Sequence, residues 1–283
     1  MEVSSLRDLI SLVHEQKKNQ LVFNGFSRVT VDFFDDMPSG PESANWFEEK
    51  KENGELNDYL KPEFRGLISD LCTILCPIDI GLENDITGYN IIGSERMTWP
   101  VKGEGKIRPR GHYWGALHTE GIDKREDIQF FINLTSKGLR VGIFNYLHED
   151  KNRWNKFIQF RLDPLREEIF QELQTVIKYG FNLISTESAD YFNHSIGEIL
   201  VPKSADEMYD FICGKKKFGV MKLIPKEQLY SSDLIEIILD LFDATRGIYE
   251  MIQPSKFKKY TRTLTTYEGV QKALHRLNTR VND

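Results

Sequence analysis

Hydrophobic residues recur along the chain at two different spacings, and these spacings separate helical from strand-like regions. In several segments they recur every three or four positions, which is typical of a helix with one buried side. We therefore predict helices at residues 4–18, 42–51, 62–76, 164–178 and 232–253. Shorter helices are predicted after Ser27 and Ser204, because a serine hydroxyl suits the position that caps a helix N-terminus.

Between residues 89 and 146 the hydrophobic residues alternate with polar ones instead, as they do in strands that bury one face. Residues 127–135 and 139–143 flank the turn Ser136-Lys137-Gly138 and predict a β-hairpin. A further strand is predicted at residues 220–224. We expect an α+β fold with flanking helices and a central, mostly antiparallel sheet formed by about residues 89–146 and 220–224.

The same patterns predict how the chain is organised. Residues 1–20 are expected to form an N-terminal amphipathic helix, and residues 21–253 a single α+β domain. Residues 254–283 are basic and carry only a modest apolar stripe, so they form either a linker or a solvated C-terminal helix. A linker would make the chain the front part of a longer protein.

Charge and cysteine content narrow the class of protein. The 283 residues carry a formal net charge of −6, which argues against a protein that coats nucleic acid through bulk positive charge. The three cysteines, Cys72, Cys76 and Cys213, suggest no disulfide framework, and the first residues carry no apolar signal segment. No run approaches the roughly 18 consecutive apolar residues of a membrane span. We expect a soluble, cytoplasmic protein without a membrane partner.

Positive charge and aromatic rings are concentrated in residues 94–118, which we call the basic aromatic segment. Lysine and arginine neutralise phosphates, and aromatic rings stack on bases. If residues 106–118 form one strand, its alternation places on one face Arg108, Arg110, His112, Trp114, Ala116 and His118. Arg140 extends that face if its strand is a neighbour. The predicted nucleic-acid-binding residues are Arg96, Lys102, Lys106, Arg108, Arg110, His112, Tyr113, Trp114 and Arg140. The alternative is structural: Trp114 packs against a helix, and the arginines pair with carboxylates.

No motif in the sequence points to catalysis or to a cofactor. The P-loop, G-x-G-x-x-G, H-E-x-x-H and G-x-S-x-G patterns are absent. His112, His118 and Glu120 would share a strand face, but their spacing is not that of a known metal site. We therefore predict no catalytic residue, no metal ion and no cofactor.

A series of sequence motifs extends over residues 23–252. In chain order they are FSRVTVDFFDDM, NWFEEKK, HYWGALH, QFFINLTSKGLRVGIF and FGVMKLIPKEQLYSSDLIEIILDLFDATRGIYEMI. Together they resemble the bacterial and archaeal family called domain of unknown function 2461, whose Trp-Phe helix is matched by Asn45, Trp46, Phe47 and Lys50. The family's Arg-Asp pair and its Lys-x-Pro-Tyr-Lys string are not reproduced in the basic aromatic segment.

Some members of this family resemble the N-terminal modules of McrB-type, GTP-driven restriction motors, in which the front domain chooses the DNA. The resemblance therefore implies a nucleic-acid-recognition domain of a restriction or antiviral defence system, without catalysis of its own. It implies DNA as the ligand, including DNA with modified bases, and a fused or associated GTPase motor and nuclease subunit as partners. Two alternatives remain open: an enzyme acting on a nucleotide or small phosphorylated substrate in the same cleft, and a protein-interaction module.

Overall fold

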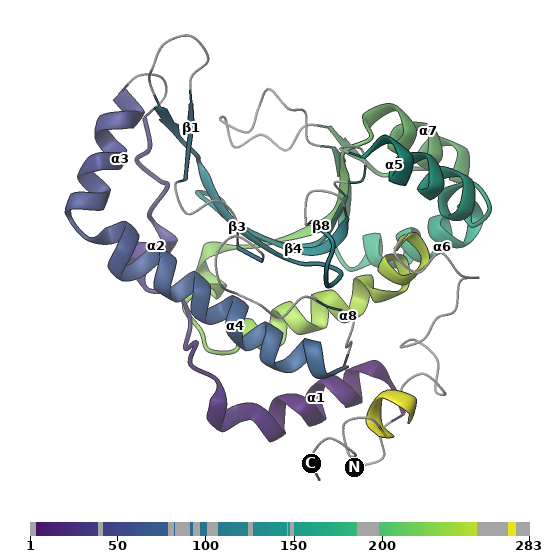
Figure 1. Ribbon diagram of the computed structural model, residues 1–283, viewed down its shortest axis with the longest axis horizontal. Helices are drawn as coiled ribbons and strands as arrows, with labels where there is room; N and C mark the ends of the chain where they lie inside the picture. Colours follow the sequence, from purple (N-terminus) through teal and green to yellow (C-terminus); the bar gives the residue numbers. More distant parts are fainter. Residues whose placement is uncertain are drawn as a thin grey trace.

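A strongly curved antiparallel sheet forms the centre of the molecule, and long helices cover its convex side (Figure 1). The computed structural model describes residues 4–38, 42–78, 82, 91–92, 97–100, 107–123, 127–145, 147, 150–185, 198–253 and 271–275. Residues 98–100 and 107–108 are described by their backbone alone. The predicted α+β class with a central antiparallel sheet is confirmed.

The main sheet has six strands in the order β3-β4-β5-β8-β6-β7, and each neighbouring pair is antiparallel. Its strands are β3 His112–Leu117, β4 Ile128–Thr135, β5 Gly138–Asn145, β6 Asn182–Ser185, β7 Ile199–Leu200 and β8 Phe218–Ile224. The predicted hairpin is β4 and β5, and the predicted strand at 220–224 is β8. A separate two-stranded sheet pairs β1 Thr98–Pro100 with β2 Ile107–Pro109.

Most of the predicted helices are confirmed. The α-helices are α1 Leu6–Lys17, α2 Arg28–Val31, α3 Glu42–Glu52, α4 Lys61–Ile78, α5 Lys151–Phe157, α6 Arg166–Lys178, α7 Ala205–Lys215 and α8 Leu234–Ile252. Short helical turns are η1 Lys18–Gln20, η2 Glu55–Leu60, η5 Ile158–Leu162 and η6 Lys226–Gln228. The predicted end of α4 before Pro77 is wrong, because burial of Leu75 and Ile78 on the apolar side carries the helix through the proline to its last residue.

Helix α1 shows how the N-terminal helix joins the domain. Ser5 and Asp8 form a capping box, and the backbone and hydroxyl hydrogen bonds that Asp8 accepts from Ser4 and Ser5 lower its pKa to about 2. The apolar side of α1, with Leu9 and Val13 buried, packs against α4 and α8. The predicted helix within residues 1–20 is therefore an integral part of the fold. Of residues 254–283, only the helical stretch 271–275 is described, so the linker prediction lies largely outside the described residues.

The convex face of the main sheet forms the principal hydrophobic core with α4 and α8. Alternate residues of the strands point into it, among them Leu117, Ile132 and Val141, which are all fully buried. Gly115 lets α4 approach β3 closely, because an added Cβ would lie 2.7 Å from the Cδ1 atom of Ile68. None of the helices in the described ranges is long and apolar enough to cross a membrane.

Candidate nucleic-acid interface

The basic aromatic segment does not form the single strand predicted for residues 106–118, and that prediction is wrong. Arg108 lies in β2, which belongs to the small sheet, whereas β3 of the main sheet begins at His112. Between them, the Arg110 amide donates to the carbonyl oxygen of Met97 at 2.6 Å. Pro109 cannot donate a backbone hydrogen bond, so the ladder cannot continue through it on both sides. Arg108 and Arg110 are therefore not on the strand that carries Trp114.

Three of the predicted cations, Arg96, Lys102 and Lys106, lie outside the described residues. Within β3 the predicted alternation is confirmed. His112, Trp114 and Ala116 point to the concave side of the sheet, and Tyr113 points to the convex side. The ring of Tyr113 is 2% exposed and meets Phe64 edge to face, with 4.9 Å between ring centroids. The prediction that Tyr113 contacts nucleic acid is wrong in this structure, because its side chain belongs to the main core.

Three aromatic rings lie in a row on the concave side, which we call the inner face. The Trp114 and Phe131 ring centroids are 5.4 Å apart, and those of Phe131 and Phe144 are 5.1 Å apart. The rings come from β3, β4 and β5 and are tilted by about 30° to one another, at 32° and 31°. Ala116, Ile184 and Met221 complete this second, smaller apolar cluster. The inner face thus presents π-surfaces where the convex face presents mainly aliphatic side chains.

Polar side chains continue the inner face beside the rings. The strand register places Trp114 opposite Asn133, and Asn133 opposite Arg140, in one row across three strands. The condition set for Arg140 is not met, because β4 lies between the strands that carry Trp114 and Arg140. Both residues nevertheless belong to one face, since each is directly opposite Asn133. Burial lowers the pKa of Arg140, so its guanidinium carries charge in poorly solvated surroundings.

The described residues of the inner face are buried throughout β3, β4 and β5, and their exposure is slightly higher toward one end. Ala116, Gln129 and Phe144 are at most 2% exposed. A second set is between 7 and 9% exposed and consists of His112, Trp114, Phe131, Asn133 and Arg140. We call this set the open end. It combines two rings, an amide, an imidazole and a guanidinium, which are groups that stack on and hydrogen-bond to a planar heterocycle.

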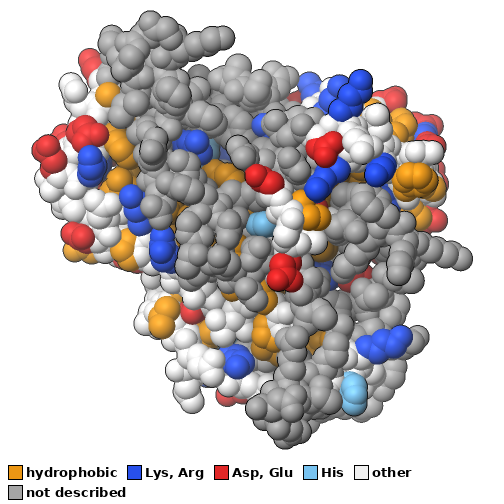
Figure 2. All heavy atoms as spheres, in the orientation of Figure 1, with side chains coloured by type: hydrophobic (Ala, Val, Ile, Leu, Met, Phe, Trp, Pro, Cys, Tyr) orange, Lys and Arg blue, Asp and Glu red, His pale blue; other side chains and the backbone are white. Residues whose placement is uncertain are grey.

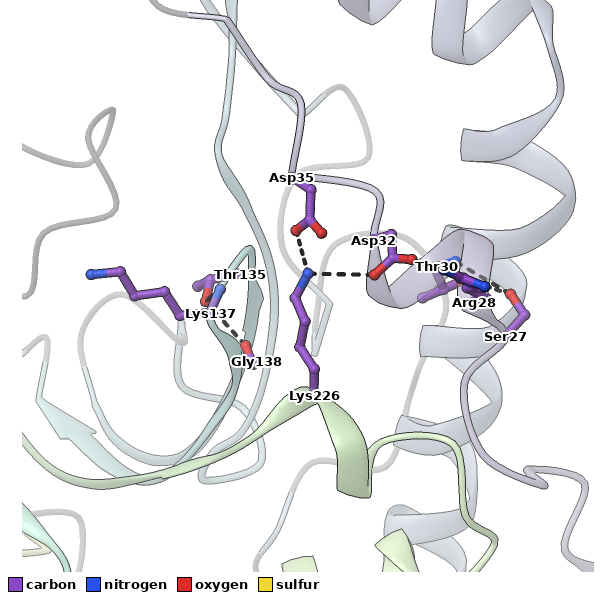
Figure 3. Close-up of polar contacts among 9 residues, drawn as sticks. All are labelled: Ser27, Arg28, Thr30, Asp32, Asp35, Thr135, Lys137, Gly138 and Lys226. Atoms are coloured by element: carbon purple, nitrogen blue, oxygen red, sulfur yellow. Dashed lines mark hydrogen bonds and ion pairs between the residues drawn. The ribbon is translucent and has the colours of Figure 1, made fainter.

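Several charged side chains elsewhere form ion pairs with one another. Lys226 of η6 contacts Asp32 and Asp35 and so ties the end of α2 to the segment after β8, whereas Lys137 at the hairpin tip points away from them (Figure 3). Arg166 binds Asp163 and Asp206 at 2.7 and 2.6 Å. Figure 2 shows described Lys and Arg side chains interspersed with Asp and Glu on the visible face. Any attraction for phosphates is therefore local, as the acidic net charge predicts.

The enzyme alternative directs attention to His118, which has the carboxylate of Asp127 nearby. Its Nδ1 atom lies 3.1 Å from the Thr119 carbonyl oxygen, and the neighbouring Asp127 accepts the Thr119 amide at 2.9 Å. Burial raises the pKa of Asp127. Gln253 donates from Nε2 to the Thr119 hydroxyl and to the Tyr249 hydroxyl, at 3.0 and 2.9 Å. These contacts join the end of β3 to the end of α8, which is a structural task.

Cavity and metal geometry give no further support to a catalytic centre. A small cavity among the described residues lies on the other side of the sheet, between α1, α4 and α8, and is bordered by Asp243 and Arg246. Within the described part of the chain, no group of three or more His, Cys, Asp or Glu is placed to hold a metal ion. Cys72, Cys76 and Cys213 are free thiols.

Sequence reasoning missed Phe131, Asn133 and Gln129 as members of the inner face. The signal lies in the sequence of β4, IQFFINLT. Gln129, Phe131 and Asn133 occupy the positions between its apolar core residues and therefore share the opposite face. Alternation shows which residues share a face without showing what covers that face. Neither models of known protein families nor curated protein sequences match the chain. The functional argument therefore depends on the geometry of the inner face.

Proposed function

We propose that this chain is a nucleic-acid-recognition domain that binds DNA through the open end of the inner face. The observation that carries the proposal is the row Trp114-Asn133-Arg140, which sets a ring, an amide and a buried guanidinium side by side across three strands. Stacking of a base on an aromatic side chain is worth about 1–3 kcal/mol. Arginine and asparagine supply the donors that distinguish one base edge from another.

Phosphate contacts would come from the basic aromatic segment. Arg110 precedes β3 directly, so it lies next to the strand that carries His112 and Trp114. Lys102, Lys106 and Arg108 are the other cations of the segment that we assign to phosphates, on the evidence of the sequence alone. Each phosphate contact contributes a slope of about 0.7–0.9 to the dependence of log affinity on log salt. With four such cations the slope should not exceed about 4.

The biological setting belongs to the same proposal. The resemblance to domain of unknown function 2461 supports a role in a restriction or antiviral defence system, in which this domain selects DNA, with or without modified bases, for a GTPase motor and a nuclease. No catalytic step is assigned to the chain. The buried contacts of His118 and Asp127 fit a structural role better than an enzymatic one.

Fluorescence anisotropy tests the proposal directly. Labelled single-stranded, duplex and methylated duplex oligonucleotides are titrated with the protein at several salt concentrations. We expect salt-dependent binding that is weakened by Arg110→Ala and by Trp114→Leu. Lys137→Ala is the matched control, because Lys137 is exposed at the tip of the β4–β5 hairpin. In Figure 3 its side chain points away from the ion pairs of Lys226 with Asp32 and Asp35. Absence of binding to every oligonucleotide, or binding that both site variants leave unchanged, would refute the proposal.

A further inference from the structure

We infer that α1 is a pH-sensitive strap, which docks more tightly on α4 and α8 as the pH falls through the range in which histidine becomes charged. Two features of the structure support this inference: a row of charged groups where α1 meets α8, and a small cavity under α1. The inference is independent of the proposed function, because it concerns the helical side of the main sheet.

Two ion pairs connect α1 to α8. Arg7 Nη2 lies 3.3 Å from Asp240 Oδ2, and His14 Nδ1 lies 3.6 Å from Glu236 Oε1. The two basic residues are about two turns apart on α1, and the two acidic residues are about one turn apart on α8, so each pair follows one side of its helix. Asp243 comes about one turn further along α8. We call these five residues the charged seam.

The apolar contact between α1 and the rest of the molecule is incomplete. Helix α1 lies along α4 and α8 (Figure 1), and its residues Leu6 and Ile10 line the cavity together with Phe242 and Asp243. Side chains that border a cavity lose dispersion contacts that close packing would give them. A free helix of only 12 residues is also marginal in water, so undocking of α1 should break its backbone hydrogen bonds as well. Docking therefore depends noticeably on the charged seam.

His14 is the member of the seam whose residue type changes charge near neutral pH, between about pH 5 and 8. Its side chain is 17% exposed, and it is charged only when protonated. Glu236 of α8 faces the ring, and Asp70 of α4 also attracts it electrostatically. On α1 itself, Lys17 follows in the last turn. A proton on His14 therefore strengthens the attraction to both helices on which α1 rests.

Asp243 acts in the same direction. Burial, to which Leu6 and Ile10 of α1 contribute, and the neighbouring Asp240 raise the pKa of Asp243, whereas Arg7 and Arg246 partly oppose the rise. The buried state consequently binds this proton more tightly than a solvated aspartate does. Docking should gain as the pH falls from the raised pKa toward the ordinary aspartate value.

Hydrogen exchange on the complete chain, followed by mass spectrometry, tests the inference. The protection of the α1 amides is corrected for the intrinsic pH dependence of exchange and compared with that of α6, which contains no histidine. We expect the protection of α1 to be about three- to tenfold higher at about pH 6 than at about pH 8, with the protection of α6 unchanged.

Variants assign the effect to the seam. His14→Gln should remove most of the pH dependence by lowering the protection of α1 at about pH 6. Asp243→Asn should raise that protection at about pH 8, where the wild-type carboxyl is ionised. The matched controls are His275→Gln and Asp210→Asn, because both side chains are exposed and lie outside the seam. The thermal unfolding midpoint of each variant is compared with wild type. If a seam variant unfolds, the comparison of α1 with α6 in the wild-type protein decides alone.

Three results would overturn the inference. The first is protection of α1 that does not change with pH relative to α6, and the second is protection that increases with pH. The third is a pH dependence that His14→Gln leaves intact, because another group would then be responsible. None of these results bears on oligonucleotide binding, so the proposed function is judged separately by anisotropy.

Discussion

The two faces of the main sheet are built from the same strands but differ in chemistry. The convex face is apolar, and its members Leu117, Ile132 and Val141 are completely buried against the helices. The inner face interleaves rings with Asn133 and Arg140, although it is nearly as well buried. Burying polar groups costs free energy that an apolar face avoids. This difference is the observation on which the proposed ligand-binding role rests.

Buried charge also occurs on the helical side of the sheet. Arg246 and Glu250 of α8 form an ion pair at 3.1 Å, and both side chains are 5% exposed. The guanidinium carbon of Arg246 lies 5.4 Å from the Phe130 ring centroid and 5.2 Å from that of Tyr249. The pair is a structural unit within one helix. Arg246 therefore provides a structural reference against which the binding role proposed for Arg140 can be compared.

The largest expected effect comes from adjacent phenylalanines on opposite faces. Phe130 packs on Phe242 and Tyr249, with centroids 4.7 and 4.2 Å away, so Phe130→Ala should lower the free energy of unfolding by about 3–5 kcal/mol. Phe131→Ala should cost at least about 1 kcal/mol less, because its site at the open end can relax or take up water, but it should abolish base stacking. Urea unfolding and oligonucleotide titration measure the two effects. Equal destabilisation without a change in binding would remove the distinction between the faces.

The two buried arginines give the next largest effect. Arg246→Met leaves the Glu250 carboxylate buried without its cation, and it should cost about 3 kcal/mol. Arg140→Met removes the guanidinium that we propose for ligand contact, so oligonucleotide binding should fall, whereas Arg246→Met should leave binding unchanged. Chemical denaturation and anisotropy on the same preparations provide the measurement. A large loss of stability in Arg140→Met would mean that Arg140 is structural.

The smallest effect concerns Asp243, on the helical side. Burial and the neighbouring Asp240 raise its pKa, so the folded protein binds this proton more tightly than the unfolded chain does. Stability therefore decreases as pH rises from the ordinary aspartate pKa through the raised value, and the penalty is fully present above that raised value. Asp243→Asn should raise the free energy of unfolding at pH 7 by less than about 1 kcal/mol.

The gain from Asp243→Asn should shrink as the pH is lowered through this range, because the wild-type carboxyl becomes neutral as well. Thermal unfolding between pH 3 and 7 measures it, and oligonucleotide binding at pH 7 should not change. A gain that persists at the lowest pH, or a change in binding, would show that Asp243 acts by something other than its charge.

Local pattern was sufficient to predict much of this fold. The β4–β5 hairpin is predicted by eight-residue alternation around a short turn, and α8 by a long apolar stripe that ends before a proline. The prediction failed at residues 106–118, where β2 pairs with β1 and leaves the main sheet. Strand pairing depends on a partner distant in sequence, which periodicity cannot identify. The prediction had placed Arg108 and Arg110 on one strand with Trp114, and the structure separates them.

The sequence by itself determined which residues share a side within each strand, because successive side chains point to opposite faces. It thereby placed His112 and Trp114 together and Tyr113 opposite them. Only the tertiary structure decided that β4 lies between β3 and β5, that Asn133 joins Trp114 to Arg140, and that the helices cover the other face. The physical reason is that alternation is satisfied whichever side is covered, whereas neighbour order and register depend on contacts made across the whole chain.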